Sequence, residues 1–256
     1  MSAEQVLIGA ALGFVAGLLA GVFGVGGGIV TTPGVQHLLG AAPIEAVATP
    51  LPIILPTSLV GAHAYARAGE IDRRAATWVV GPGLVGTIAG ALLTELVDAH
   101  ALLLVTAFLI AWTGAGVIRG RHAPPVDRPH VPGWAYAGVG LLAGTVSGLL
   151  GVGGGIVLVP AFTALGMPLK RALGTSLLCI AALVVPGTIA HALLGHIDWS
   201  IFVVVTLGVI PGARLGARLA LGAREHVLRL VVGSFLLCVA AAYGVSELVQ
   251  LLAGRG

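Results

Sequence analysis

Two glycine clusters are the residues of this chain whose type and spacing could do chemistry. The segment GVGGGIV occurs at residues 24–30 and again at residues 151–157. Each cluster lies in an apolar run, where every glycine costs a helix about 0.8–1 kcal/mol relative to alanine. In hydrocarbon, the N–H and C=O groups freed by such a break must be buried in protein or line a polar cavity. A helix that resumes at Ile29 or Ile156 would direct its positive end there, which favours an anion.

Hydroxyl and imidazole groups near the clusters could complete a site. Threonine and serine hydroxyls could donate hydrogen bonds to ligand oxygens, or they could bond back to their own helices. His63 and His191 could relay protons, or they could be interfacial or hydrogen-bonded within the bundle. The expected substrate-binding residues are Gly24, Gly26, Gly27, Gly28, Thr31, Thr32, Pro33 and Thr49 in the first half, and Gly151, Gly153, Gly154, Gly155, Pro160, Thr175 and Ser176 in the second. Thr31 and Thr32 have no hydroxyl counterparts in the second copy, so the site would be asymmetric.

Other readings of the glycines are weaker. Two GxxxG pairs just before the clusters, at residues 17–21 and 144–148, are typical of close helix packing. A nucleotide-binding loop is disfavoured because no GK[ST] follows and the spacing is not GxGxxG. The sequence contains no HExxH, no paired-cysteine motif and no convergent carboxylate pair. We therefore expect no metal, no cofactor and no catalytic residues, and the chain is not predicted to be an enzyme.

The composition excludes a soluble domain. The chain is 57% hydrophobic and 9% charged, with a mean hydropathy of +1.06, whereas soluble domains carry about 25% charged residues. We predict an all-α polytopic membrane protein. Six apolar runs are long enough to cross about 30 Å of hydrocarbon; they are residues 44–66, 75–97, 101–118, 171–194, 201–221 and 227–252. Two longer runs, 6–39 and 134–165, are interrupted by the clusters, and we expect pieces of about 10 to 17 residues from each.

The sequence contains an internal repeat that covers both halves of the chain. Ten of the seventeen positions in residues 17–33 are identical in residues 144–160 at an offset of 127, and later matches share an offset of 126. The only sizeable polar linker is RGRHAPPVDRPHVPG. We therefore predict a first repeat at residues 1–118, a Pro- and Arg-rich linker at 119–133 and a second repeat at 134–256, each with one broken segment and three transmembrane helices.

The basic residues predict how the repeats are related. If each broken segment crosses once, the basic residues divide almost evenly between the two faces. If each segment enters and returns, as a re-entrant hairpin or as two short crossings, twelve of the 13 Lys and Arg residues share one face and only Arg255 lies on the other. The positive-inside rule places the crowded face in the cytoplasm. The repeats would then be inverted, with the linker cytoplasmic and both termini outside the plasma membrane.

The motifs also carry a family resemblance. Gly-x-Phe-Gly-Val-Gly-Gly-Gly followed by Pro33, its copy ending at Pro160 and the pair Thr175-Ser176 resemble the sulfite exporter TauE/SafE family over essentially the whole chain. The resemblance implies an integral membrane permease for sulfite, sulfonates such as sulfoacetate, or other small sulfur-containing anions. Thr49-Pro50 departs from the expected Thr-Ser pair in the first half.

These observations together predict a secondary transporter, an exporter or permease, in the plasma membrane. Its substrate would be a small sulfur-containing anion such as sulfite, thiosulfate or an organosulfonate, moved by alternating access between the two breaks. H⁺ or Na⁺ could be the coupling ion, and no nucleic-acid partner is expected. The oligomeric state is not predicted. The alternatives are an anion channel on the same scaffold and, less favoured, a membrane-embedded enzyme or a scaffold protein.

Overall fold

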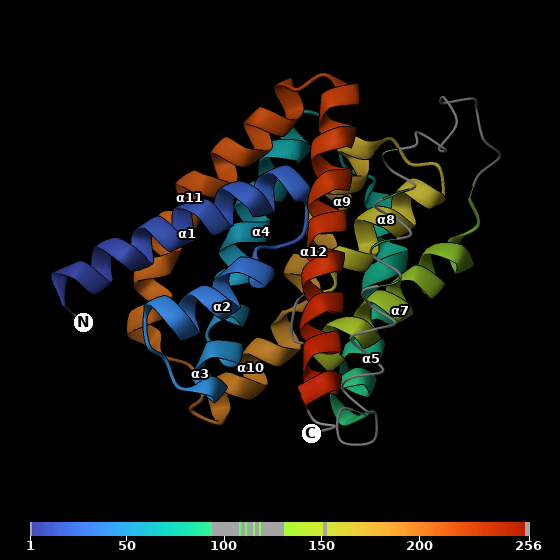
Figure 1. The fold of residues 1–256 in the computed structure, drawn as a ribbon. Coiled ribbons are helices and arrows are strands. Elements are labelled where there is room, and N and C mark those ends of the chain that lie inside the picture. The colour runs from blue at the N-terminus through green and yellow to red at the C-terminus, as the bar shows by residue number, and fades with distance from the viewer. Residues whose placement is uncertain are drawn as a thin grey trace.

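The computed structural model describes residues 2–93, 131–150 and 153–253, and the isolated positions 108, 111, 115 and 118. Within these ranges the protein is all-helical and contains no strand, which confirms the predicted all-α class (Figure 1). Most of the expected linker at 119–133 and of the expected crossing at 101–118 lies outside the described residues. The described helices are α1 (Ala3–Phe23), α2 (Gly28–Leu38), α3 (Pro43–Ala48), α4 (Pro50–Arg67), α5 (Arg73–Leu93), α7 (Gly133–Leu150), α8 (Gly155–Ala164), α9 (Leu169–Leu183), α10 (Val185–Leu193), α11 (Trp199–Gly222) and α12 (Glu225–Ala253).

Four stretches of the described chain are long and apolar enough to cross a membrane. They are Ala3–Phe23, Ile44–Arg67, Leu169–Leu193 and Trp199–Gly222. The expected length of 10 to 17 residues was wrong for the first piece of each broken segment, because α1 has 21 residues and α7 has 18. The glycines that precede each cluster do not end the helix, since they pack against a neighbouring helix that compensates their low helix propensity.

Two helix pairs pack through glycine, and each pair joins the two halves of the chain. Helix α1 runs parallel to α11, and α7 runs parallel to α5 (Figure 1). A Cβ atom added at Gly17 would overlap the Val209 carbonyl oxygen, and one added at Gly144 would overlap the Gly83 carbonyl oxygen. The backbones therefore touch directly, as in small-residue packing of membrane helices. Since α1 and α5 come from the first half and α11 and α7 from the second, the halves are interlocked.

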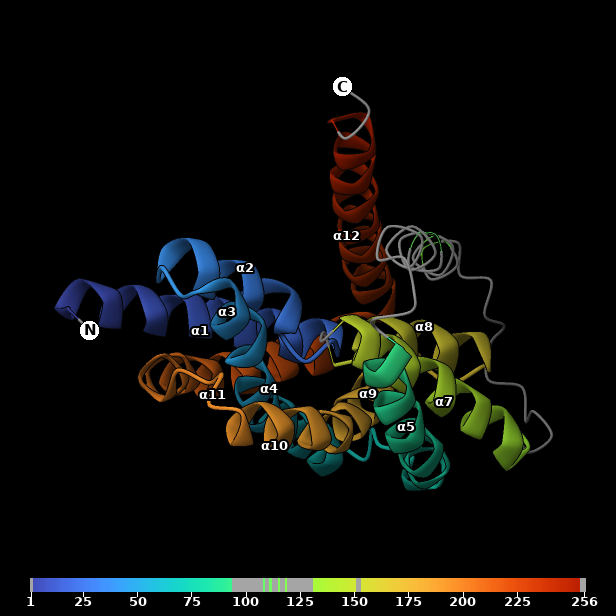
Figure 2. The same cartoon turned by 90° about the horizontal axis from the view of Figure 1, so that it is seen from below.

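Helices α4 and α9 cross at the centre of the molecule in antiparallel directions. Leu177 of α9 packs on Gly61, and Gly174 packs on Tyr65 near the far end of α4. Ile54 and Ile180, which are related by the repeat offset of 126, are both buried at the middle of this crossing. In contrast, α12 projects away from the other labelled helices, as Figure 2 shows. It is anchored near its start, where Phe235 stacks on Phe23 of α1 with ring centroids 3.8 Å apart.

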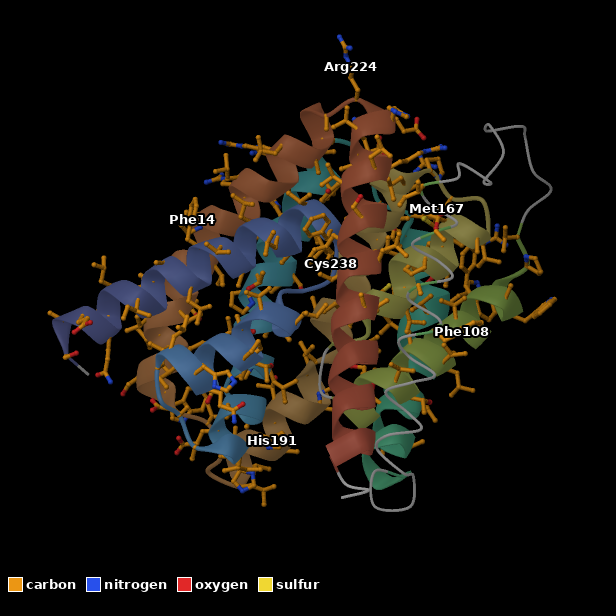
Figure 3. The ribbon with its side chains drawn as sticks, viewed as in Figure 1. Phe14, Phe108, Met167, His191, Arg224 and Cys238 are labelled. Atoms are coloured by element: carbon orange, nitrogen blue, oxygen red, sulfur yellow. The ribbon has the colours of Figure 1, made fainter. Side chains whose placement is uncertain are left out.

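The basic side chains of the described residues gather at one end of the molecule. This basic end is where α4 and α11 finish and α5, α9 and α12 begin (Figure 1). Its members are Arg67, Arg73, Arg74, Lys170, Arg171, Arg214, Arg218, Arg224 and Arg229. Arg224 marks this end in Figure 3, and His191 lies toward the opposite end. The Lys170 ammonium group donates a 2.6 Å hydrogen bond to the Leu221 carbonyl oxygen and so ties the start of α9 to the end of α11.

Candidate functional site

Each glycine cluster separates two helices. Helix α1 ends at Phe23, and Gly24 (φ 69°) donates its N–H to the Ala20 carbonyl oxygen as a left-handed cap. Gly26 (φ 79°) and Gly27 (φ 87°) are also left-handed, and α2 begins at Gly28. In the second copy Gly153 (φ 77°) and Gly154 (φ 69°) precede α8, while Gly151 lies outside the described residues. Glycine is needed here because side chains rarely tolerate positive φ.

The chain reverses direction at both clusters. A Cβ atom on Gly27 would lie 3.5 Å from that of Ala20, while further along α2 Gly34 packs on Leu12, and Leu39 packs on Gly9. Helix α2 therefore runs back along α1 toward its start. In the second copy Gly154 packs on Ser147 of α7. The ring of Phe162 on α8 lies 6.2 Å from that of Tyr136 near the start of α7.

The two reversals meet at the centre of the protein. A Cβ atom added at Gly26 would lie 3.0 Å from Ile180 Cγ2 and 3.1 Å from Ile54 Cγ2. One added at Gly153 would lie 3.3 Å and 3.7 Å from the same two side chains. A Cβ atom on Gly155 would lie 2.7 Å from the Cα atom of Val25 in the other cluster. Two loops that are half a chain apart in sequence thus face one isoleucine pair.

Both helices that begin at these loops have unpaired amide groups. In α2 the first donors are Val30 and Thr31, which both donate to the Gly27 carbonyl oxygen at 3.1 Å. In α8 Val157 and Leu158 donate to Gly154 at 3.1 and 3.2 Å. Within the described chain, the amides of residues 28 and 29 and of residues 155 and 156 have no acceptor. Free N–H groups at a helix start are the usual donors to a bound anion.

Ser58 adds a hydroxyl group that sequence reasoning missed. It is fully buried in α4, and its Oγ atom has no hydrogen-bond partner among the described residues. That atom would lie 3.5 Å from a Cβ atom on Gly26, so it sits beside the first glycine loop. Thr57, the next residue toward the N-terminus, instead bonds back to the Ile53 carbonyl oxygen at 2.6 Å. A polar residue at mid-span in an apolar helix was the signal that could have identified Ser58.

Three of the expected hydroxyls link the two halves in this conformation. The Asp72 amide donates to Thr175 Oγ1 at 2.9 Å, and the Asp198 amide donates to Thr49 Oγ1 at 3.1 Å. Thr49 corresponds to Thr175, and Asp72 to Asp198, at the offset of 126. The two hydrogen bonds are therefore equivalent in the two repeats. Ser176 donates to the Gly24 carbonyl oxygen at 2.9 Å. Its counterpart is Pro50, which has no hydroxyl, so this bond has no equivalent in the first half.

The expected residues on α2 and α8 are placed differently from one another. The Thr31 hydroxyl is buried and bonds back to the Gly27 carbonyl oxygen at 3.2 Å. Thr32 is half-buried and Pro33 is exposed, whereas Pro160 of α8 is buried. The glycines are therefore brought together at the centre, but Thr32 and Pro33 are turned away from the core.

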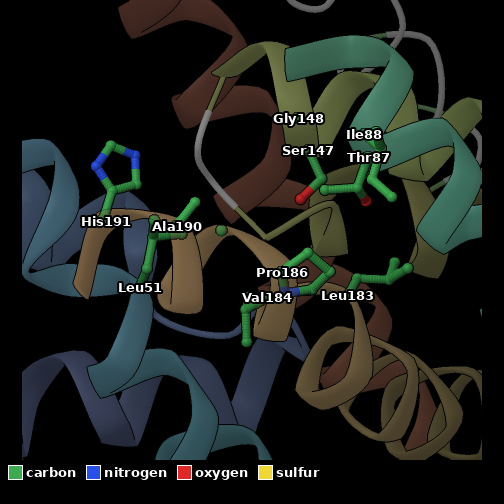
Figure 4. Close-up of a pocket in the computed structure, with 11 residues that line it drawn as sticks. Leu51, Thr87, Ile88, Ser147, Gly148, Leu183, Val184, Pro186, Ala190 and His191 are labelled. Atoms are coloured by element: carbon green, nitrogen blue, oxygen red, sulfur yellow. The ribbon is translucent and has the colours of Figure 1, made fainter. Parts of the chain in front are cut away.

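A cavity opens beside the second glycine loop, toward the end opposite the basic one. It has a volume of about 280 Å³ and lies between α5, α7, α10 and the start of α4 (Figure 4). Thr87 and Ser147 supply hydroxyl groups to its wall, and Val184 of the wall lies 3.5 Å from a Cβ atom on Gly153. We call this space the open cavity. Pro186 lines the open cavity at the junction of α9 and α10. The helix is interrupted there because proline cannot continue the helical hydrogen-bond pattern.

The equivalent space at the basic end is filled by Tyr65. His191 and Gly148 line the open cavity, and their repeat counterparts are Tyr65 and Gly21. Tyr65 is fully buried and donates its hydroxyl to the Gly21 carbonyl oxygen at 3.0 Å. The counterpart of Pro186 is Val60, so α4 continues unbroken to Tyr65 and holds the ring in place.

The two histidines expected to relay protons are not brought together. His191 lines the open cavity, and its Nδ1 atom lies 3.2 Å from Nδ1 of His196. His63 is exposed in a groove at the basic end. The counterpart of His63 is Ile189, so the two histidines are not repeat equivalents.

Comparison with known proteins places this chain in a family. The model of the family "Sulfite exporter TauE/SafE" matches residues 9–243. A "Probable membrane transporter protein" of Xylella fastidiosa (strain 9a5c) is 30% identical over 94% of this chain and 95% of its own length. The "Probable membrane transporter protein YunE" of Bacillus subtilis (strain 168) is 27% identical over 81% and 84%. No solved structure matches the chain. With a family match over most of its length and relatives named as membrane transporters, this chain belongs to the sulfite exporter TauE/SafE family.

Proposed function

We propose that this membrane transporter carries a small sulfur-containing anion, such as sulfite, thiosulfate or an organosulfonate, through a site between the two glycine loops. The observation that carries the proposal is the meeting of two helix N-termini, each with unpaired amides, beside the unpartnered hydroxyl of Ser58. All of these groups can donate hydrogen bonds. Oxyanion oxygens are acceptors, and each helix start adds about half a positive charge.

The glycines explain how a compact oxyanion could approach these amides. At Gly26 and Gly153 there is no Cβ atom between the backbone and the central isoleucine pair. The contacts of Gly26 and Gly153 with Ile54 and Ile180 are made by isoleucine side chains, which can change rotamer. Their displacement would expose the amides without unfolding a helix. Ser58 lies beside the first loop, and its counterpart beside the second loop is Val184, which has no hydroxyl group. The proposed site is therefore asymmetric and would hold the anion closer to α2.

The unequal ends of the molecule support alternating access. The open cavity reaches the second loop from one end, while the fully buried Tyr65 closes the other. By the positive-inside rule the basic end would face the cytoplasm, with the linker on that side and both termini outside. The described conformation would then be open to the outside. We propose inverted repeats in which the α1–α11 and α5–α7 pairs move as rigid units around α4 and α9.

An anion channel is the second candidate, because the same donors could line a pore. Closure by Tyr65 at one end disfavours a continuous pore and favours a transporter. The named relatives are membrane transporters, which disfavours an enzyme or a scaffold protein. H⁺ or Na⁺ remains the proposed coupling ion, with no residue assigned to bind it.

Substitution of Ser58 should separate substrate binding from folding. We expect Ser58→Ala to raise the KM for transport by about tenfold or more, because a hydrogen bond to a charged group contributes about 1.5–3 kcal/mol. The ligand-free variant should unfold at the same temperature or higher, since a buried hydroxyl without a partner is itself destabilising. The matched control is Thr57→Val, whose hydroxyl bonds to its own helix. An unchanged KM in Ser58→Ala would remove Ser58 from the site.

The decisive test is transport by the purified protein in liposomes. Sulfite, thiosulfate, sulfate and sulfoacetate would each be offered, with protein-free liposomes as the control. We expect saturable uptake and counterflow with at least one sulfur-containing anion. Flux that rises linearly without counterflow would indicate the channel. If no anion moves and none raises the unfolding temperature, the proposed substrate class is wrong.

A further inference from the structure

A second cavity lies on the outer surface toward the basic end, between α4 and α11 from their middles to their ends. It has a volume of about 540 Å³. Its rim carries Arg67, Arg214 and Arg218, and its floor is apolar, with Leu59 and Ile210 among its residues. We call this cavity the arginine groove.

The guanidinium groups of the rim form no ion pair with the described part of the chain. All three arginines are exposed, and none of them has a carboxylate within ion-pair distance among the described residues. Among the described residues of this end, the ion pair that forms joins Arg229 to Glu225 on α12. The described residues that line the groove include no acidic one. Three unpaired guanidinium groups around one cavity attract an anion, and their planar forks suit a phosphate.

The apolar floor faces away from the protein core. Leu59 is 49% exposed, Ile210 is 41% exposed and the neighbouring Leu207 is 66% exposed. In a membrane-spanning pair of helices such side chains contact acyl chains. Arg67 lies eight residues beyond Leu59, and Arg218 eight beyond Ile210, which is about 12 Å along each helix. The rim therefore sits above the apolar floor by roughly the step from hydrocarbon to headgroup layer.

The groove is separate from the proposed transport site. On α4 the face that carries Ser58 and Tyr65 packs inward against the first glycine cluster and Gly21. Leu59 and Arg67 belong to the opposite, outward face. On α11 the inward residues Val205 and Val209 contact α1, whereas Ile210 and Arg214 point outward.

We propose that the arginine groove binds one anionic glycerophospholipid. Its phosphate lies among Arg67, Arg214 and Arg218, and an acyl chain lies against Leu59 and Ile210. A basic rim over an exposed apolar floor complements the charge and the amphipathic shape of such a lipid. The bound lipid contacts both α4, the helix that carries Tyr65, and α11. This binding does not depend on the identity of the transported anion.

The test compares lipids with different headgroups on the full-length protein after removal of bound lipid in detergent. Phosphatidylglycerol, phosphatidylethanolamine with the same acyl chains, and soluble glycerol 3-phosphate would be titrated by native mass spectrometry and thermal unfolding. We expect phosphatidylglycerol to bind and to raise the unfolding temperature. Equal binding of phosphatidylethanolamine would overturn the proposal, because the headgroup charge would not matter. Competition by glycerol 3-phosphate at equal concentration would assign the groove to a soluble anion instead.

Variants locate the binding in the groove. Arg67→Gln/Arg214→Gln/Arg218→Gln should weaken phosphatidylglycerol binding by at least about tenfold, since each basic residue near an anionic lipid contributes a factor of about five. The matched control, Arg73→Gln/Arg74→Gln/Arg224→Gln, removes three exposed charges from the same end outside the groove. Equal loss in both would mean diffuse charge attraction and no groove. If the first variant fails to fold, Leu59→Trp/Ile210→Trp fills the floor with the charges intact and should also abolish binding.

Discussion

Gly144→Ala should lower the free energy of unfolding by about 2 kcal/mol or more, whereas Gly138→Ala on the same helix should be neutral or stabilising. A Cβ atom at Gly144 would overlap the Gly83 carbonyl oxygen and lie 2.8 and 2.9 Å from two more backbone atoms of Gly83. Backbone on both sides cannot move aside, so α7 and α5 must separate. At Gly138 an added Cβ atom meets nothing within 4 Å, and alanine favours the helix.

Thermal unfolding of the detergent-solubilised protein measures both variants. Gly17 is the repeat counterpart of Gly144, and its Cβ atom would lie 2.8 Å from the Val209 Cα atom and overlap the neighbouring carbonyl oxygen. Gly17→Ala should therefore cause a loss similar to that of Gly144→Ala. If both proteins unfold at the wild-type temperature, the glycine contacts do not lock the two halves together.

Tyr65→Ala should open the basic end. Removal of a buried aromatic ring commonly costs about 3–5 kcal/mol of stability. Here the substitution should destabilise the conformation in which the basic end is closed, because Tyr65 fills the space beside Gly21 in that conformation. Cysteines at the repeat-related positions Leu51 and Leu177 would report on the two ends, in a protein without Cys179 and Cys238. Leu51 lines the open cavity, whereas Leu177 is fully buried against Gly61.

A membrane-impermeant thiol reagent should label Leu177→Cys from the basic side at least about tenfold faster in the Tyr65→Ala background. Tyr65→Phe should have a smaller effect, because it removes only a hydrogen bond, at about 0.5–1.5 kcal/mol. Phe162→Ala removes an equally buried ring of α8 and controls for general loosening. Equal labelling in the Phe162→Ala and Tyr65→Ala proteins would show that Tyr65 does not close this end.

The fold class and the family of this protein could be predicted from its composition and its glycine motif. A chain with 9% charged residues cannot cover its surface against water, so an all-helical membrane protein was the expected outcome and was confirmed. The doubled glycine motif indicated the TauE/SafE family, which the family match confirmed. The predicted length was wrong only for the first piece of each broken segment, because the glycines before the cluster, such as Gly13, Gly17 and Gly21 of α1, do not end the helix but pack against α11.

The sequence by itself determined the features that depend on local propensity and on solvent: apolar helices, and a break at each glycine cluster, where Gly26, Gly27, Gly153 and Gly154 have positive φ. Only the tertiary structure decided which polar groups have partners. Thr49 and Thr175 occupy matched positions in the first half of the apolar spans Ile44–Arg67 and Leu169–Leu193. Each nevertheless accepts a hydrogen bond from an amide of the other half, 149 and 103 residues away. Ser58 has no partner within the described ranges, and Tyr65 fills at the basic end the space that is open beside His191 at the other end. Such pairings depend on where two interlocked halves meet, and no pattern along a single helix records that position.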